Sequence, residues 1–329
     1  MTTIKKGTVK VDMNLAHQCL GHVSEAALRH MATRYGWKLK GKLSKNCPGC
    51  GYAKGHQKNV PKDTAKRATK IGERIFIDLS GPFLISPSGN KYWCLMIDDA
   101  TRKCWSRFIR VKSDIGTPLE ELIVKLNGNG TPIRNIRCDG AGENRKYVGQ
   151  LCDKYGINLE RTAPNTPQQN GVVERAFAII KAKATAMMEQ AGFTHGTRRL
   201  LWAEAVNTAT YLRNIGPNAA NEDMKAADEL FYGERPKGYE FLHPFGQVGY
   251  VAERGGGHHR AFHPRSQKCI FIGYAETASQ DCFQFYNPRT CRVIESRDVR
   301  WAEWHGQPTT VTKGLREFLL PDVETNHYH

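Results

Sequence analysis

The sequence predicts a mixed α/β protein built from three successive parts. Residues 1–60 combine short helical patterns with histidines and cysteines at metal-ligand spacing. Residues 71–215 begin with three strand patterns and continue with alternating helices and strands, an order that favours a mixed sheet. Residues 244–304 contain short strand patterns alone, which indicates a small β-barrel.

Length and composition indicate a globular protein with several domains. A chain of 329 residues exceeds the usual size of one hydrophobic core. No apolar run approaches the roughly 18 to 20 residues that cross a bilayer, and the polar N-terminus lacks the apolar stretch of a secretory signal. We therefore expect no membrane partner and a reducing compartment. There, the ten cysteines serve as thiols or metal ligands rather than disulfides.

The net charge of +16 is concentrated near the N-terminus. Residues 1–70 contain 15 lysines and arginines against 3 acidic residues, whereas residues 166–240 balance at 9 and 9. A basic segment joined to a nearly neutral body is typical of a protein that binds a polyanion, and nucleic acid is the commonest one. Solvated surface lysines are the alternative interpretation.

The first part is expected to be helical, and a linker separates it from the second. Ser24 is expected to cap a helix over about residues 25–33, where Ala27, Leu28 and Met31 share one face. The linker is lysine-rich and extends to residue 70, as is typical of a domain boundary.

Hydrophobic periodicity and turn residues define the remaining elements. Strands of the second part are expected over residues 74–79, 92–98, 104–111, 133–139 and 158–161. Its helices are expected over residues 118–126, 147–155, 167 or 171 to 190, and 200–213. Residues 216–243 are interpreted mostly as connection. Strands of the third part are expected over residues 247–252, 268–274, 282–286, 292–296 and 299–301, and residues 305–329 form a tail.

His17, His22, Cys47 and Cys50 have the composition of a structural zinc site. Two imidazoles and two thiolates suit a closed tetrahedral centre. Residues five apart diverge by about 140° on an unbroken helix, so we expect Gly21 to break the helix and return His22 towards His17. So small a segment would gain much of its folding free energy from the metal.

Two other interpretations of these residues exist. A zinc knuckle could use Cys47, Cys50 and His56, but it needs a further cysteine soon after the histidine, and the next one is Cys94. Alternatively, the thiols and histidines bind no metal.

Asp78, Asp139 and Glu174 form a second candidate constellation. Asp78 and Asp139 come at the ends of apolar strand patterns, and Glu174 lies just inside a helix. Clustered carboxylates need a cation to offset their repulsion, and oxygen ligands suit Mg²⁺ or Mn²⁺. Two such ions can support phosphoryl transfer. Asp98 and Asp99 are a competing acidic pair.

These motifs occur in a characteristic order. The chain resembles the integrase of copia-type LTR retrotransposons, and more distantly retroviral integrases, from about residue 17 to residue 301. The motifs are LAHQCLGH (15–22), CPGC (47–50), FIDLSGP (76–82), YWCLMIDDATR (92–102), CDGAGE (138–143), APNTPQQNGVVER (163–175), LWAEAV (201–206) and KCIFIGY (268–274).

The resemblance implies an RNase H-like core in which Asp78, Asp139 and Glu174 bind the catalytic Mg²⁺ or Mn²⁺, and an N-terminal His-His-Cys-Cys domain that binds Zn²⁺. It also implies that Asp98 and Asp99 end a strand and do not catalyse. The implied enzyme is a metal-dependent polynucleotidyl transferase and endonuclease. It would trim the 3′ end of the element's DNA and join that end to target DNA.

The implied partners are DNA and further copies of the chain, with no small-molecule substrate. The implied location is a cytoplasmic particle and then the nucleus. A non-catalytic DNA-binding derivative and a nuclease that only hydrolyses are the alternatives. The sequence departs from the family at Ala16, at Gly140, and in the 34 residues that separate Asp139 from Glu174.

Several basic residues are candidates for DNA contact. Lys181 lies seven residues after Glu174 and therefore shares its helix face. The alternative is that Lys181 is simply a solvated surface side chain. The other candidates are Arg175 and Lys183 on the same helix, and Lys54 and Lys58 in the basic linker.

Overall fold

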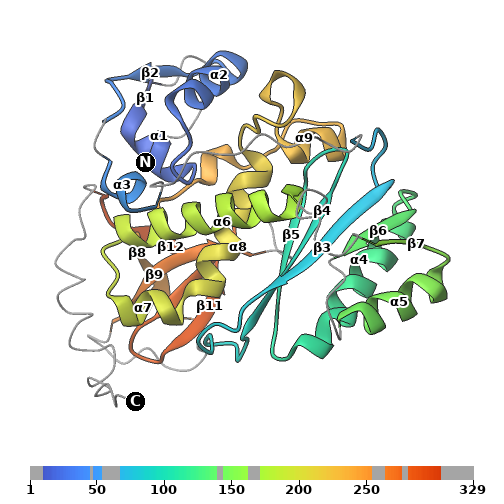
Figure 1. The fold of residues 1–329 in the computed structure, drawn as a ribbon. Coiled ribbons are helices and arrows are strands. Elements are labelled where there is room, and N and C mark those ends of the chain that lie inside the picture. The colour runs from blue at the N-terminus through green and yellow to red at the C-terminus, as the bar shows by residue number, and fades with distance from the viewer. Residues whose placement is uncertain are drawn as a thin grey trace.

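The computed structural model describes residues 10–44, 47–53, 67–138, 144–161, 171–253, 264–275 and 281–304. These residues form three sheets with helices around and between them (Figure 1). The protein is therefore of the mixed α/β class, as predicted. None of the described helices is both long and apolar enough to cross a membrane.

The N-terminal part packs small helices against a two-stranded parallel sheet. Its elements are β1 (Lys10–Asp12), α1 (Met13–Cys19), α2 (Glu25–Tyr35), β2 (Lys38–Lys40) and α3 (Pro48–Ala53). Ser24 caps α2 as predicted, because its hydroxyl accepts a hydrogen bond from the Ala27 amide at 3.2 Å. The sequence analysis missed the β1–β2 pair, since a three-residue strand shows almost no periodicity.

The central sheet has the strand order β5-β4-β3-β6-β7. Its strands are β3 (Arg74–Ser80), β4 (Tyr92–Asp98), β5 (Cys104–Ile109), β6 (Asn135–Cys138) and β7 (Asn158–Arg161). β3 pairs antiparallel with β4 and parallel with β6, so it is the centre of the sheet. All five strands were predicted, with ends that differ by a few residues.

Each face of the central sheet is covered by helices. One face packs on α4 (Gly116–Gly128) and α5 (Asn144–Tyr155), which follow the short η1 (Lys112–Ile115). The other face packs on α6 (Gly171–Gln190) and α8 (Trp202–Ile215), which are separated by the short α7 (His195–Leu200). The alternation of side chains along β3 therefore sends Ile75 and Ile77 to α4 and α5, and Phe76 to α6.

The C-terminal part is a five-stranded antiparallel sheet in the order β11-β10-β9-β8-β12. Its strands are β8 (Val248–Ala252), β9 (Ser266–Tyr274), β10 (Phe283–Asn287), β11 (Arg292–Ser296) and β12 (Val299–Trp301). Helix α8 lies between the two large sheets and packs on β5 and on β9 (Figure 1). Closure of the predicted barrel would need a ladder between β11 and β12, and the pairings of the described residues include none.

The connection expected over residues 216–243 contains short helices. They are η3 (Glu222–Met224), α9 (Ala227–Tyr232) and η4 (Tyr239–Phe241). Ion pairs from Asp228 to Lys103 and from Glu229 to Arg34 fix α9 between β5 and α2. These helices are held by a few charged and aromatic anchors rather than by a long apolar face, so periodicity does not reveal them.

Candidate metal centre and candidate active site

The structure brings together the four predicted zinc ligands. One potential ligand atom from each of His17, His22, Cys47 and Cys50 lies within 4.8 Å of the others. His22 Nδ1 is 3.1 Å from His17 Nε2, 3.4 Å from Cys47 Sγ and 3.7 Å from Cys50 Sγ. His17 Nε2 is 3.2 Å from Cys50 Sγ.

These separations fit a tetrahedral zinc ion. With Zn–N near ~2.0 Å and Zn–S near ~2.3 Å, a tetrahedron has edges of about 3.3 Å between two nitrogens and about 3.5 Å between nitrogen and sulfur. The observed nitrogen–nitrogen and nitrogen–sulfur distances, 3.1 to 3.7 Å, match these edges. The donor set and its spacing are therefore compatible with bound Zn²⁺ without rearrangement.

The backbone orients the two histidines for this purpose. His17 Nδ1 lies 2.7 Å from the Val23 carbonyl, a contact that makes Nδ1 the protonated nitrogen and turns Nε2 towards the centre. Helix α1 ends before Gly21, where the backbone turns left-handed with φ of 68° at Gly21 and 60° at His22. The predicted glycine break is confirmed, and it returns His22 to His17.

The candidate metal centre is packed directly on helix α6. At Gly49 a Cβ atom would lie 2.7 Å from the Ala186 carbonyl oxygen of α6 and 2.9 Å from His22 Cε1. Only a residue without a side chain fits between the ligand ring and the helix. A Cβ at Gly21 would likewise meet the Lys183 stem at 3.6 Å. The centre and α6 therefore share a backbone-to-backbone contact.

The first acidic candidate, Asp78, lies on β3, two residues before the end of that strand. Its strand pairs in parallel with β6, and Ile77 is opposite Cys138. Asp139 follows Cys138 in the sequence and lies outside the described residues. Asp78 is half-buried on the α6 side of the sheet, because it alternates with the buried Ile77 on the opposite side.

Lys181 connects α6 to the strand that carries Asp78. Its Nζ donates to Ser80 Oγ at 3.0 Å and lies 5.7 and 5.6 Å from the ring centroids of Phe83 and Phe177. Partial burial lowers the pKa of Lys181, while the Asp78 carboxylate acts in the opposite direction. The amine is thus a cation held beside Asp78.

Glu174 lies in the first turn of α6 and is exposed. Lys181 lies seven positions further along the helix, so both project from one face of the helix. A carboxylate is favoured at this position because the amino end of a helix carries a partial positive charge. The structure therefore presents Glu174 on the helix face that Lys181 turns towards β3.

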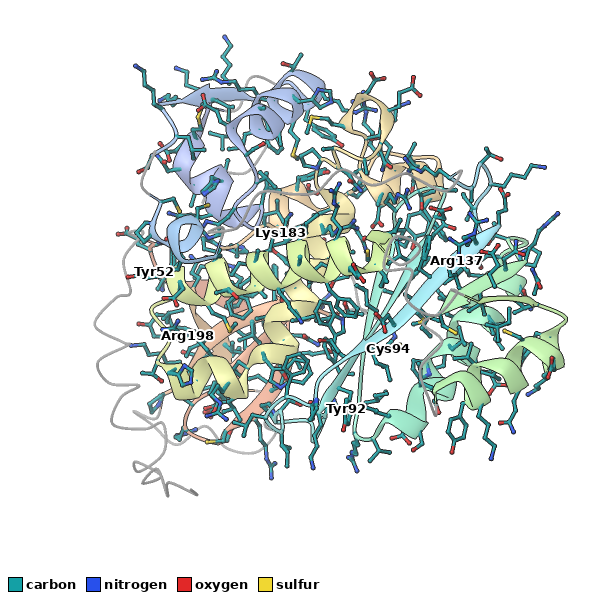
Figure 2. All side chains as sticks on the ribbon, viewed as in Figure 1. Tyr52, Tyr92, Cys94, Arg137, Lys183 and Arg198 are labelled. Carbon is teal, nitrogen blue, oxygen red and sulfur yellow. The ribbon has the colours of Figure 1, made fainter. Side chains whose placement is uncertain are left out.

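The other basic candidates are placed differently. Arg175 is exposed beside Glu174. Lys183 lies on the side of α6 that faces the N-terminal part (Figure 2), where its stem approaches Gly21. Lys54 and Lys58 lie outside the described residues. Lys181 is thus the candidate whose contact with the Asp78 strand is described.

Asp98 and Asp99 are engaged by the turn that follows β4. Asp98 accepts hydrogen bonds from the Gly72 and Thr101 amides, at 2.9 and 2.8 Å. Asp99 forms ion pairs with Arg74 at 3.0 Å and with Arg102 at 2.5 Å. Both residues are buried, so their oxygens hold the turn together.

Two features of the site were not predicted. Ser80 receives Lys181, and its position two residues after Asp78 on a strand could have revealed it, because such residues share a face. Arg137 on β6 pairs with Glu160 at 2.5 Å and lies 5.6 Å from the Phe76 ring centroid (Figure 2). The sequence offered no signal for this pair, since it depends on the β6–β7 register.

Comparison with known proteins finds similar polyproteins of plant transposons. Residues 250–314 match the family described as the retroviral polymerase SH3-like domain. The chain is 30% identical over 323 residues to the Retrovirus-related Pol polyprotein from transposon TNT 1-94 of Nicotiana tabacum, covering 96% of this chain and 23% of that protein. It is 26% identical over 295 residues to the corresponding polyprotein from transposon RE2 of Arabidopsis thaliana, covering 87% and 19%.

A solved structure also shows a distant likeness. It is the cryo-EM structure of the simian T-cell lymphotropic virus intasome in complex with PP2A regulatory subunit B56 gamma, at 12% identity and a TM-score of 0.37, covering 72% of this chain and 84% of that one. The chain spans less than a quarter of the length of its polyprotein relatives. The resemblance to copia-type elements is confirmed: the chain is a relative of the retrovirus-related Pol polyproteins of plant transposons.

Proposed function

We propose that the chain is the integrase region of such a polyprotein. It would trim the 3′ end of element DNA and then join the freed 3′-hydroxyl to a phosphate of target DNA. The observation that carries this proposal is the parallel register of β3 and β6, with Ile77 opposite Cys138. Asp78 follows Ile77 on β3, and in the sequence Asp139 follows Cys138, the last residue of β6. Because neighbouring strands lie about 4.8 Å apart, this register supports a shared site for the two acids.

The surrounding architecture supports the same assignment. A central strand that is antiparallel to one neighbour and parallel to the other, in the order β5-β4-β3-β6-β7, agrees with an RNase H-like core. Helix α6 packs on β3 and β4 and brings Glu174 as the third acid. We also propose the domain organisation expected from the sequence, which is a zinc-binding domain, a core and a C-terminal barrel.

The residues of the site have separate roles in this proposal. Asp78, Asp139 and Glu174 would hold two Mg²⁺ or Mn²⁺ ions, which when bound stabilise charge on the attacking and leaving oxygens of the phosphodiester. Lys181, held by Ser80, would bind a phosphate of the DNA end and orient it. The rings of Phe83 and Phe177 lie within 6 Å of the Lys181 amine, at a distance that favours its positive charge.

The N-terminal centre would hold zinc for a structural reason. All four of its positions are filled by protein atoms, which is typical of a structural rather than a catalytic zinc site. The basic surplus of residues 1–70 would attract DNA phosphates. Joining two DNA ends would need more than one copy of the chain, and the reaction would take place in the nucleus after assembly in a cytoplasmic particle.

A strand-transfer assay tests the proposal. Labelled element-end DNA, target DNA and Mg²⁺ are incubated with wild type, with Asp139→Asn and with Glu121→Gln. The last variant removes an exposed carboxylate from α4, on the opposite face of the sheet. Joined product from wild type and Glu121→Gln, but not from Asp139→Asn, is the expected result. Hydrolysis without joining would assign a nuclease, and no product with any metal would assign a non-catalytic derivative.

A further inference from the structure

Lysine side chains cover the solvent face of the small N-terminal sheet. The parallel register of β1 and β2 places Lys10 opposite Lys38, and Asp12 opposite Lys40. Residues paired in this way are about 4.8 Å apart, and alternate residues of one strand are about 6.6 Å apart. Lys10, Lys38 and Lys40 are all exposed, and we call them the lysine ladder.

The strands that carry the ladder pack on the apolar cluster of the N-terminal part. Val11 and Leu39 alternate with the lysines and pack beneath the sheet on the apolar cluster of α1 and α2. The Asn14 side chain then fixes the segment after β2, because its amide donates to the Lys42 carbonyl at 3.2 Å and its oxygen accepts from the Ser44 amide at 2.8 Å. Lys42 is exposed beside the ladder.

The ladder carries three positive charges, and Asp12 lies opposite one of them, Lys40. None of its three lysines forms an ion pair within the part of the chain that the structure describes. Asp12 directs Oδ1 to the amides of Asn14 and Leu15, where it caps α1. Like charges directly opposite on paired strands repel. Such an arrangement costs stability unless an external anion shares the lysines.

Some exposed cations on other surfaces are arranged differently. Three of them lie against carboxylates at 2.6 to 3.5 Å: Lys154 with Glu120, Lys237 with Glu234, and Arg289 with Glu253. These pairs are solvated surface charges that need no ligand. The ladder differs from these three pairs because its lysines face one another across paired strands and not a carboxylate that they bind.

We propose that the lysine ladder is a binding surface for the phosphate backbone of duplex DNA, separate from the acidic site. The choice of DNA as the polyanion rests on the proposed function. Figure 1 shows β1 and β2 at the outer margin of the N-terminal part, with α6 between them and β3. The ladder therefore holds duplex away from the reacting end. Its contact is insensitive to sequence, because lysines on phosphates do not read bases.

Salt-dependent DNA binding by the full zinc-loaded chain tests this surface. The test variant is Lys10→Gln/Lys38→Gln/Lys40→Gln, and the control is Lys154→Gln/Lys237→Gln/Arg289→Gln, which has the same net charge. Binding of a labelled duplex is measured by fluorescence anisotropy from 50 to 200 mM KCl without divalent cations. Each phosphate contact contributes about 0.9 to the slope of log affinity against log salt.

The expected result is a slope smaller by about 2.7 in the ladder variant and nearly unchanged in the control. The ladder variant should unfold at a temperature close to that of wild type, since it loses both the repulsion between Lys10 and Lys38 and the attraction between Lys40 and Asp12. Equal slopes in the two variants would overturn the proposal. The proposal would also fail if polyglutamate bound to the ladder as tightly as duplex DNA does. If the ladder variant binds as wild type and both join DNA ends, the ladder assignment fails alone. If duplex binds through the ladder but wild type joins no ends, the proposed function fails alone.

Discussion

Gly49 is the position at which the candidate zinc centre and helix α6 meet, and Gly49→Ala should disrupt this contact. The added Cβ would lie 2.7 Å from the Ala186 carbonyl oxygen and 2.9 Å from the His22 ring. Both distances are too short for carbon, so α3 must move away from α6 or push His22 out of the ligand cluster. Overpacking of this kind costs about 1 to 3 kcal/mol.

Gly51→Ala provides a matched control in the same short helix. No atom lies within 4 Å of a Cβ at Gly51, and alanine is favoured over glycine in a helix interior by about 1 kcal/mol. The two variants make the same chemical change and the same gain in helix propensity. Their difference therefore isolates the contact with Ala186 and His22.

Zinc affinity, measured by competition with a chromophoric chelator, is the primary assay. A cost of about 1 to 3 kcal/mol corresponds to roughly 5- to 150-fold weaker binding for Gly49→Ala, and Gly51→Ala should bind as wild type. Hydrogen exchange around Ala186 should also accelerate in Gly49→Ala alone. Wild-type affinity in Gly49→Ala, or an equal loss in Gly51→Ala, would refute the proposed coupling between the centre and α6.

Three further predictions concern the ligands, the cation and a buried acid. Cys50→Ser should reduce bound zinc from one equivalent to nearly none and expose α1 to α3 to proteolysis. Cys19 lies outside the ligand set, so Cys19→Ser should retain zinc. Zinc retention by Cys50→Ser would contradict the tetrahedral assignment. Lys181→Met should weaken end joining at least tenfold, because a charged hydrogen bond contributes about 1.5 to 3 kcal/mol. Lys183→Met should have a smaller effect, since the Lys183 stem faces Gly21. Equal losses in a strand-transfer assay would count against the role of Lys181. Burial raises the pKa of Glu204 from 4.5 to about 7, so the folded chain keeps a proton that the unfolded chain releases between these pH values, and stability should fall as pH rises through that window. Glu204→Gln should flatten this part of the profile by up to about 3 kcal/mol in urea unfolding at pH 5 to 8, and a slope equal to wild type would contradict the assignment.

Local sequence signals predicted the elements that depend on local physics. Ser24 and the apolar face behind it defined α2, and the alternation of side chains defined β3. The His-His-Cys-Cys cluster was predictable because a tetrahedral zinc site needs these residue types, and Gly21 explained how His22 could return to His17. These features are written within short stretches of sequence.

Features that depend on contacts between distant segments could not be predicted in this way. The pairing of Lys10 with Lys38 follows from how the N-terminal helices pack, and each strand alone is too short to show a pattern. The place of α8 between two sheets likewise depends on tertiary packing. In the sequence, Gly49 is simply one of the two residues between Cys47 and Cys50. Only the structure shows that it must lack a side chain, because it lies against the Ala186 carbonyl.

The central claim is that the carboxylates of Asp78, Asp139 and Glu174 share two divalent cations. Electron paramagnetic resonance of Mn²⁺ bound to the zinc-loaded chain with element-end DNA tests it most directly, because ions about 3.5 to 4 Å apart are magnetically coupled. We predict two coupled Mn²⁺ ions per chain in wild type and loss of the coupled signal in Asp78→Asn. Uncoupled Mn²⁺ in wild type, or an identical coupled signal in Asp78→Asn, would contradict the claim.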